Sequence, residues 1–81
     1  MRLFKRRQVE SDTNYSLSHF DSLYATIVSK LSVEVRAQYC ENLIGRTKED
    51  LALAINKEEV KYLRSLLIAA QREKDNLLPN N

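Results

Sequence analysis

Histidine and cysteine, the side chains most often used in acid–base and nucleophilic chemistry, each occur once in this chain. His19 follows Ser18, and no nearby pattern supplies the nucleophile and orienting group that a catalytic histidine needs. We interpret it as a surface residue near the start of a helix. Cys40 lies on an apolar row of a predicted helix, where a free cysteine behaves as a small hydrophobic residue. A single cysteine also excludes an internal disulfide and a cysteine-rich zinc site.

Two acidic pairs, Glu49-Asp50 and Glu58-Glu59, are the other candidates for chemistry, as metal ligands. Each pair falls in the first turn of a predicted helix, where carboxylates complement the positive end of the helix dipole. The sequence contains no glycine-rich phosphate loop, His-Glu-x-x-His pattern or Cys-x-x-Cys pattern. We therefore predict a protein that is not an enzyme and that uses no cofactor, metal or small-molecule substrate.

The composition favours helices. The chain has 81 residues, 43% of them hydrophobic and 30% charged, which is typical of one folded domain. One glycine and one proline supply too few turns for a many-stranded sheet. No apolar run is long enough to span a membrane, and no apolar stretch typical of a signal peptide follows the basic start. The predicted fold class is all-α, a compact bundle of three to four helices.

The first predicted helix covers residues 18–31. Ser18 is its N-cap, and Asp21 three residues later completes an acidic variant of the capping box. One apolar stripe then follows at helical spacing. It consists of Phe20, Leu23, Tyr24, Ile27, Val28 and Leu31.

The second predicted helix covers residues 32–44, with Ser32 as its N-cap. Gly45, the only glycine, is the predicted structural turn, because a left-handed residue after a helix is cheapest for glycine. Thr47 then has the spacing of a cap for a short helix over residues 48–55. Asn56 is the predicted N-cap of a long helix over residues 57–75. The alternative is a single bent helix over residues 48–75, since no glycine or proline enforces a break at Asn56.

The chain divides into a flexible basic and polar arm over residues 1–16, a helical domain over residues 17–76 and a tail over residues 77–81. The net charge is +2, yet outside residues 1–10 there are nine basic and ten acidic residues. The basic residues of the arm are predicted to contact nucleic acid or an acidic partner, with two apolar residues as anchors. They are Arg2, Lys5, Arg6 and Arg7, with Leu3 and Phe4 between them. A terminus that only improves solubility is the alternative.

The long C-terminal helix is apolar around most of its circumference. A helix of this kind in a small chain commonly buries a second face against another chain. We therefore predict a homo-oligomer whose interface anchors include Tyr62, Leu66 and Ile68. A central helix buried within the chain itself is the alternative.

Two segments, Asn42–Leu51 (NLIGRTKEDL) and Glu59–Leu67 (EVKYLRSLL), resemble the small helical accessory proteins of tailed bacteriophages. The shared pattern is a helix, a Gly-Arg-Thr turn, a short helix and an acidic-apolar-Tyr-Leu-Arg stretch. The resemblance implies a virion, DNA-packaging or host-interaction protein that works by contact. It implies a location in the host cytoplasm or the virion.

Two other functions stay open. In a helix-turn-helix protein, Gly45-Arg46-Thr47 would form the turn, with Arg46 and Lys48 at phosphates. Glu49 and Asp50 would then repel DNA, which makes this the second choice. The other is a small phage inhibitor that docks on a host protein.

The arm generates a test of nucleic-acid binding. If Arg2, Lys5, Arg6 and Arg7 bind phosphates, the slope of log affinity against log salt should fall by about 0.7–0.9 for each cation removed. The fourfold alanine variant should therefore bind with almost no salt dependence in a fluorescence-anisotropy titration with DNA or RNA. Deletion of residues 1–8 without any effect on binding would contradict this role.

Overall fold

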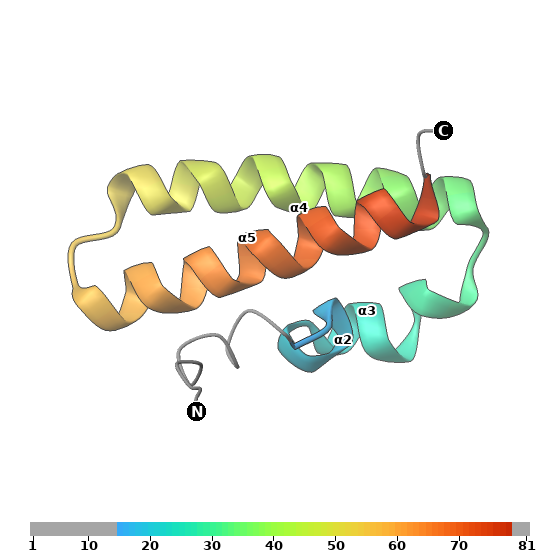
Figure 1. Ribbon diagram of the computed structural model, residues 1–81, viewed down its shortest axis with the longest axis horizontal. Helices are drawn as coiled ribbons and strands as arrows, with labels where there is room; N and C mark the ends of the chain where they lie inside the picture. Colours follow the sequence, from blue (N-terminus) through green and yellow to red (C-terminus); the bar gives the residue numbers. More distant parts are fainter. Residues whose placement is uncertain (1–14, 79–81) are drawn as a thin grey trace, which may run out of the picture.

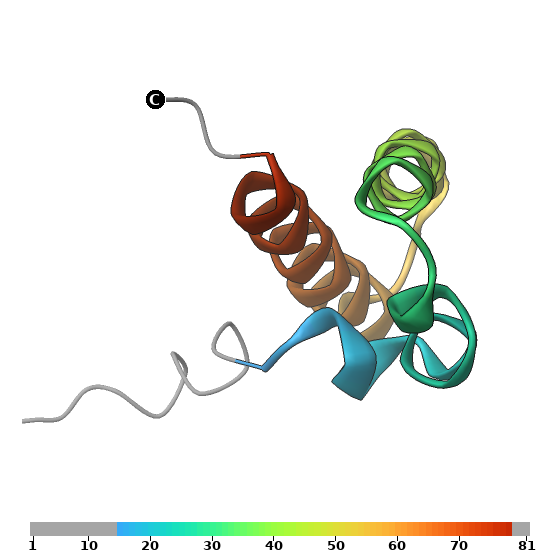
Figure 2. The ribbon, with the colours of Figure 1, turned by 90° about the vertical axis from the view of Figure 1, so that its right-hand side faces the viewer.

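The computed structural model describes residues 15–78, which form helices and no strand. Two long helices, α4 (Val33–Leu53) and α5 (Lys57–Leu77), form an antiparallel hairpin (Figure 1). Three short elements precede them: α2 (Leu17–Phe20), α3 (Ser22–Thr26) and the 3₁₀ turn η1 (Val28–Lys30). These lie together against one side of the hairpin, as the end-on view shows (Figure 2). The predicted all-α bundle is confirmed for the described residues.

The core lies where the short elements meet the hairpin. Small side chains on the two long helices, Cys40, Ala69 and Ala70, are at most 2% exposed, so the helices pack closely there. Larger apolar groups fill the remaining space. The core cluster comprises Leu17, Tyr24, Val28, Cys40, Leu43, Leu66, Ala69 and Ala70.

Two side-chain caps set the starts of the long helices, as predicted. The Ser32 hydroxyl accepts a hydrogen bond from the Val35 backbone N–H at 3.2 Å, and the Asn56 side-chain oxygen Oδ1 accepts one from the Glu59 backbone N–H at 2.7 Å. Extended backbone at Ala54 and Asn56 separates α4 from α5, so the single bent helix over residues 48–75 is wrong. The predicted helix over residues 57–75 is confirmed and runs two residues further. Leu77 therefore belongs to α5 and packs on the core rather than beginning the tail.

The predicted turn at Gly45 is wrong. Gly45 lies inside α4, and its backbone is not left-handed. The predicted helices over residues 32–44 and 48–55 are one helix. Thr47 is no cap: it is 2% exposed, and its hydroxyl donates to the Leu43 carbonyl oxygen at 2.7 Å within the helix. Because the turn is absent, the helix-turn-helix unit built on residues 45–47 does not exist.

The single helix predicted over residues 18–31 is also wrong. Asp21 adopts an extended backbone between α2 and α3, and its carboxylate caps α3 by accepting from the Tyr24 N–H at 3.1 Å. Thr26 and Ser29 donate their hydroxyls to carbonyl oxygens four residues earlier, a pattern that bends helices. The chain then leaves α-helical geometry at Ile27.

Gly45 generates a stability prediction. A Cβ at this position would meet no atom within 4 Å, so alanine fits without strain. Gly45→Ala should raise the free energy of unfolding by about 0.5–1 kcal/mol, because alanine loses less backbone entropy in a helix. Urea denaturation at a concentration where light scattering shows monomers measures this. A decrease would show that Gly45 is not helical in solution.

Candidate interaction surfaces

The histidine and the cysteine, whose side-chain types are common in catalysis, do not form a site in the described structure. His19 is exposed, stacks on Tyr15 with ring centroids 4.0 Å apart and meets Phe20 edge-on at 5.0 Å. Cys40 is fully buried; burial, and then the negative charge of Glu73, raises the pKa of its thiol to about 11. The thiol is therefore protonated near neutral pH. This agrees with its predicted place in the core.

The carboxylates of the described residues likewise form no metal-binding cluster. Among residues 15–78, no three histidine, cysteine or acidic side chains are grouped to hold a metal ion. Glu58 and Glu59 lie in the first turn of α5, as predicted. Glu49 and Asp50 do not begin a helix, because α4 runs through them, and both are exposed. Within the same residues, no helix is long and apolar enough to cross a membrane.

Two tyrosine–carboxylate hydrogen bonds attach the short elements to the hairpin. The Tyr24 hydroxyl donates to Glu73 Oε2 of α5 at 2.5 Å, and the Tyr39 hydroxyl of α4 donates to Asp21 Oδ2 at 2.6 Å. Burial is the main cause that raises the pKa of both phenols, followed by the carboxylate each one contacts; for Tyr39 the pKa is about 12. Helical periodicity cannot reveal these pairs, because the partners lie 49 and 18 residues apart.

Five exposed apolar residues lie along the chain from α3 to the first turn of α4, and we call this set the apolar ridge. Ile27 follows Leu23 by one helical turn, and the Ile27 N–H donates to the Leu23 carbonyl oxygen at 3.0 Å. The two side chains are 53% and 49% exposed, although the sequence predicted them on the same buried stripe as Tyr24 and Val28. The ridge holds five of the eleven large hydrophobic residues that are exposed in the described chain. Its members are Leu23, Ile27, Leu31, Val33 and Val35.

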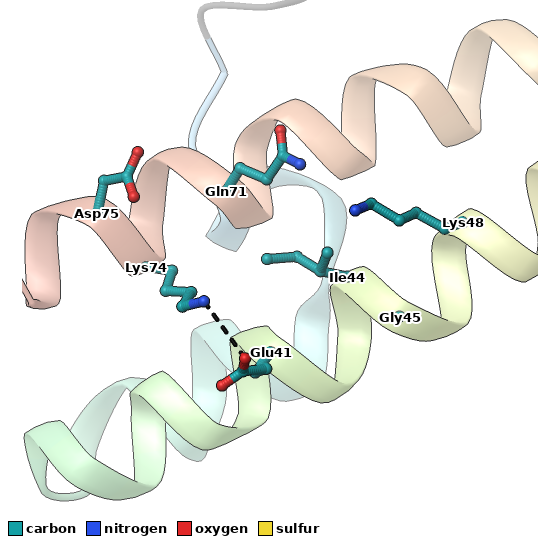
Figure 3. A pocket seen from close by; sticks show the side chains of 7 residues that line it. All are labelled: Glu41, Ile44, Gly45, Lys48, Gln71, Lys74 and Asp75. Atoms are coloured by element: carbon teal, nitrogen blue, oxygen red, sulfur yellow. Dashed lines mark hydrogen bonds and ion pairs between the residues drawn. The ribbon is translucent and has the colours of Figure 1, made fainter.

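A groove of about 540 Å³ lies between α4 and α5 (Figure 3). Its α4 side carries Gly45 and Lys48, and its α5 side carries Gln71 and Asp75. The Lys48 side chain extends over the groove toward Gln71, while Asp75 stands at the other end (Figure 3). The complete lining is Glu41, Ile44, Gly45, Lys48, Gln71, Lys74 and Asp75.

One ion pair crosses between α4 and α5 at the acidic end of this groove. Lys74 Nζ lies 3.4 Å from Glu41 Oε2, and the two side chains are 34% and 62% exposed. A solvent-exposed pair of this kind contributes little to stability, typically below about 1 kcal/mol. The pair is more important for the charge of the groove, because it neutralises Lys74, one of the two lysines that line it. The other lysine, Lys48, has no ion-pair partner among the described residues.

The three anchors predicted on the last helix have different places. Leu66 is 8% exposed and belongs to the core, so it cannot anchor another chain. Tyr62 is half exposed; its hydroxyl donates to the Phe20 carbonyl oxygen at 3.4 Å, and its ring meets the Phe20 ring edge-on. Ile68 is 36% exposed, three residues before Gln71. The helix is apolar on several sides mainly because it packs against both α4 and α2.

The predicted contact residues of the arm lie outside the described residues. They are Arg2, Leu3, Phe4, Lys5, Arg6 and Arg7. Tyr15, which the sequence assigned to the arm, stacks on α2 instead. The first helix of the described residues, α2, begins at Leu17.

Comparison with known proteins gives no information on function, so the function has to be inferred from the fold and its surfaces. No protein-family model matches the chain, and no curated protein or solved structure matches it either.

The raised pKa values generate a pH prediction. Between pH 9 and 12 the thiol and phenols ionise first in the unfolded chain, whose ordinary pKa values are 9.0 and 10.0. Below about pH 9 the protonated thiol and phenols make their full contribution to the free energy of unfolding. This contribution should fall as pH rises through the folded-state values, by up to about 1.4 kcal/mol per pH unit for each group.

Urea denaturation of the wild type and of Tyr39→Phe across this range tests the prediction. The variant should show a shallower loss of stability between pH 10 and 12. Thr26→Val, which removes a hydroxyl that does not titrate, is the control and should follow the wild type. Equal slopes for Tyr39→Phe and the wild type would contradict the proposed origin.

Proposed function

We propose that this chain is a non-enzymatic assembly or adaptor protein that acts by binding another protein. The apolar ridge is the observation that carries the proposal. Its five members fall within 13 residues of chain and are 37–53% exposed. Several exposed apolar side chains within one short segment are typical of protein interaction sites.

The position of the ridge supports the same function. Leu23 and Ile27 lie beside Tyr24 and Val28, which are 2% and 6% exposed in the core. The core contacts therefore hold the ridge in place while its outer side chains stay free for a partner. A site whose shape exists before binding loses less conformational entropy on association.

The resemblance to accessory proteins of tailed bacteriophages favours a virion or DNA-packaging assembly as the setting. An inhibitor that docks on a host protein would use the same kind of surface. The identity of the bound partner distinguishes the two.

Photo-crosslinking tests this function. A photoreactive amino acid at Ile27, on the ridge, should give one discrete adduct in lysate of the native cell or infected host. The same group at Gln38, an exposed position of α4 outside the ridge, is the control and should not give that adduct. The partner in the adduct is then identified by mass spectrometry and purified.

Calorimetry with that partner gives the quantitative result. Ile27→Ser with Leu31→Ser should weaken binding at least about tenfold, because apolar anchors dominate such interfaces. The helical circular dichroism should be unchanged, since both side chains lie outside the core. Binding at wild-type affinity would contradict the proposal.

A further inference from the structure

Gly45 is energetically unfavourable inside a helix, and no contact within residues 15–78 requires a glycine at this position. A glycine within a helix is destabilising by about 0.5–1 kcal/mol relative to alanine. Gly45 is exposed, is not left-handed and has no atom within 4 Å of the Cβ position. The missing side chain therefore makes room for nothing else within residues 15–78. It leaves space for something that approaches the backbone of α4 from outside.

The groove next to Gly45 shows which groups a molecule that binds there would contact. Beside the helix backbone it offers Ile44, which is partly buried against the core. Lys48 marks one end, and Glu41 and Asp75 mark the other. The groove is thus basic at one end and more acidic at the other.

Two of these charges have no partner in the described chain. Lys74 is paired with Glu41, whereas neither Lys48 nor Asp75 forms an ion pair with another residue of the range 15–78. Both are exposed, and they stand toward opposite ends of the groove (Figure 3). An occupant with the reverse order of charges would pair with both.

A second copy of the chain has that order of charges. Glu41 and Lys48 are equally far from the midpoint between Ile44 and Gly45, and their separation of seven positions corresponds to about 10.5 Å along the helix. A two-fold axis at this midpoint would place α4 antiparallel to its copy. Each Lys48 would then lie opposite the acidic end of the other copy. Such a self-complementary contact is what a two-fold dimer requires.

We infer that the α4–α5 groove is a homodimer interface, in which the α4 helices of two copies cross antiparallel at Gly45. Each α4 helix lies in the groove of the other copy and completes a four-helix bundle. The 21 residues of each long helix rise about 31 Å, which is enough length for such a bundle. The missing side chain at position 45 lets the two α4 backbones approach closely.

Sedimentation equilibrium of the full chain, from low micromolar to near-millimolar concentration, tests the inference. The wild type should form a reversible dimer. Gly45→Arg should weaken dimerisation at least about tenfold and keep its helical circular dichroism, because its Cβ meets open space. Asn42→Arg adds the same charge at an exposed position of α4 that does not line the groove, and it should dimerise like the wild type.

A charge exchange tests the register and does not depend on Gly45. Lys48→Glu should weaken the dimer, and adding Asp75→Lys in the same chain should restore much of the affinity. A monomeric wild type at near-millimolar concentration would overturn the inference. A dimer that tolerates Gly45→Arg, or one that Asp75→Lys fails to rescue, would also overturn it. The apolar ridge shares no residue with the lining of this groove, so the dimerisation result and the partner-binding result can be told apart.

Discussion

The fold depends on a third layer, because two helices alone enclose no core. The facing sides of α4 and α5 carry small residues such as Cys40, Ala69 and Ala70, which bring the helices close but bury little surface each. Leu17 and Tyr24 of the short elements close the open side of this seam, at 1% and 2% exposure. The position of every surface described above follows from this arrangement. The ridge begins on the outside of the added layer and ends in the first turn of α4, and the groove lies between the two long helices.

Much of the fold can be predicted from local side-chain chemistry. Ser32 and Asn56 begin helices because their oxygens satisfy backbone N–H groups nearby, and this depends only on residues three positions apart. The same holds for Cys40, whose apolar neighbours at helical spacing place it in the core. The break at Asn56 is recognisable without glycine or proline, because a strong cap with two following carboxylates favours a new helix start.

The predictions that were wrong have a common physical cause, because the correct structure at each place depends on residues that are distant in the sequence. Gly45 has the local signature of a helix end, but Leu43 and Thr47 on either side of it are buried in the bundle. Their burial outweighs the intrinsic preference of one glycine. In the same way, Asp21 interrupts the first helix, where its carboxylate accepts hydrogen bonds from the Tyr24 backbone N–H and from the distant Tyr39 hydroxyl. The groove escaped prediction because its two sides come from separate helices.

The short elements have a consequence for how the molecule opens. With four, five and three residues, α2, α3 and η1 are too short to persist as isolated helices, so their order depends on docking. Undocking of this layer is therefore a natural route of partial unfolding, with a lower free energy than separation of α4 from α5. It would carry Tyr24 away from Glu73 and bring water to Cys40. The single thiol of the chain is thus a chemical reporter: the rate at which it is labelled measures how often this layer leaves the hairpin.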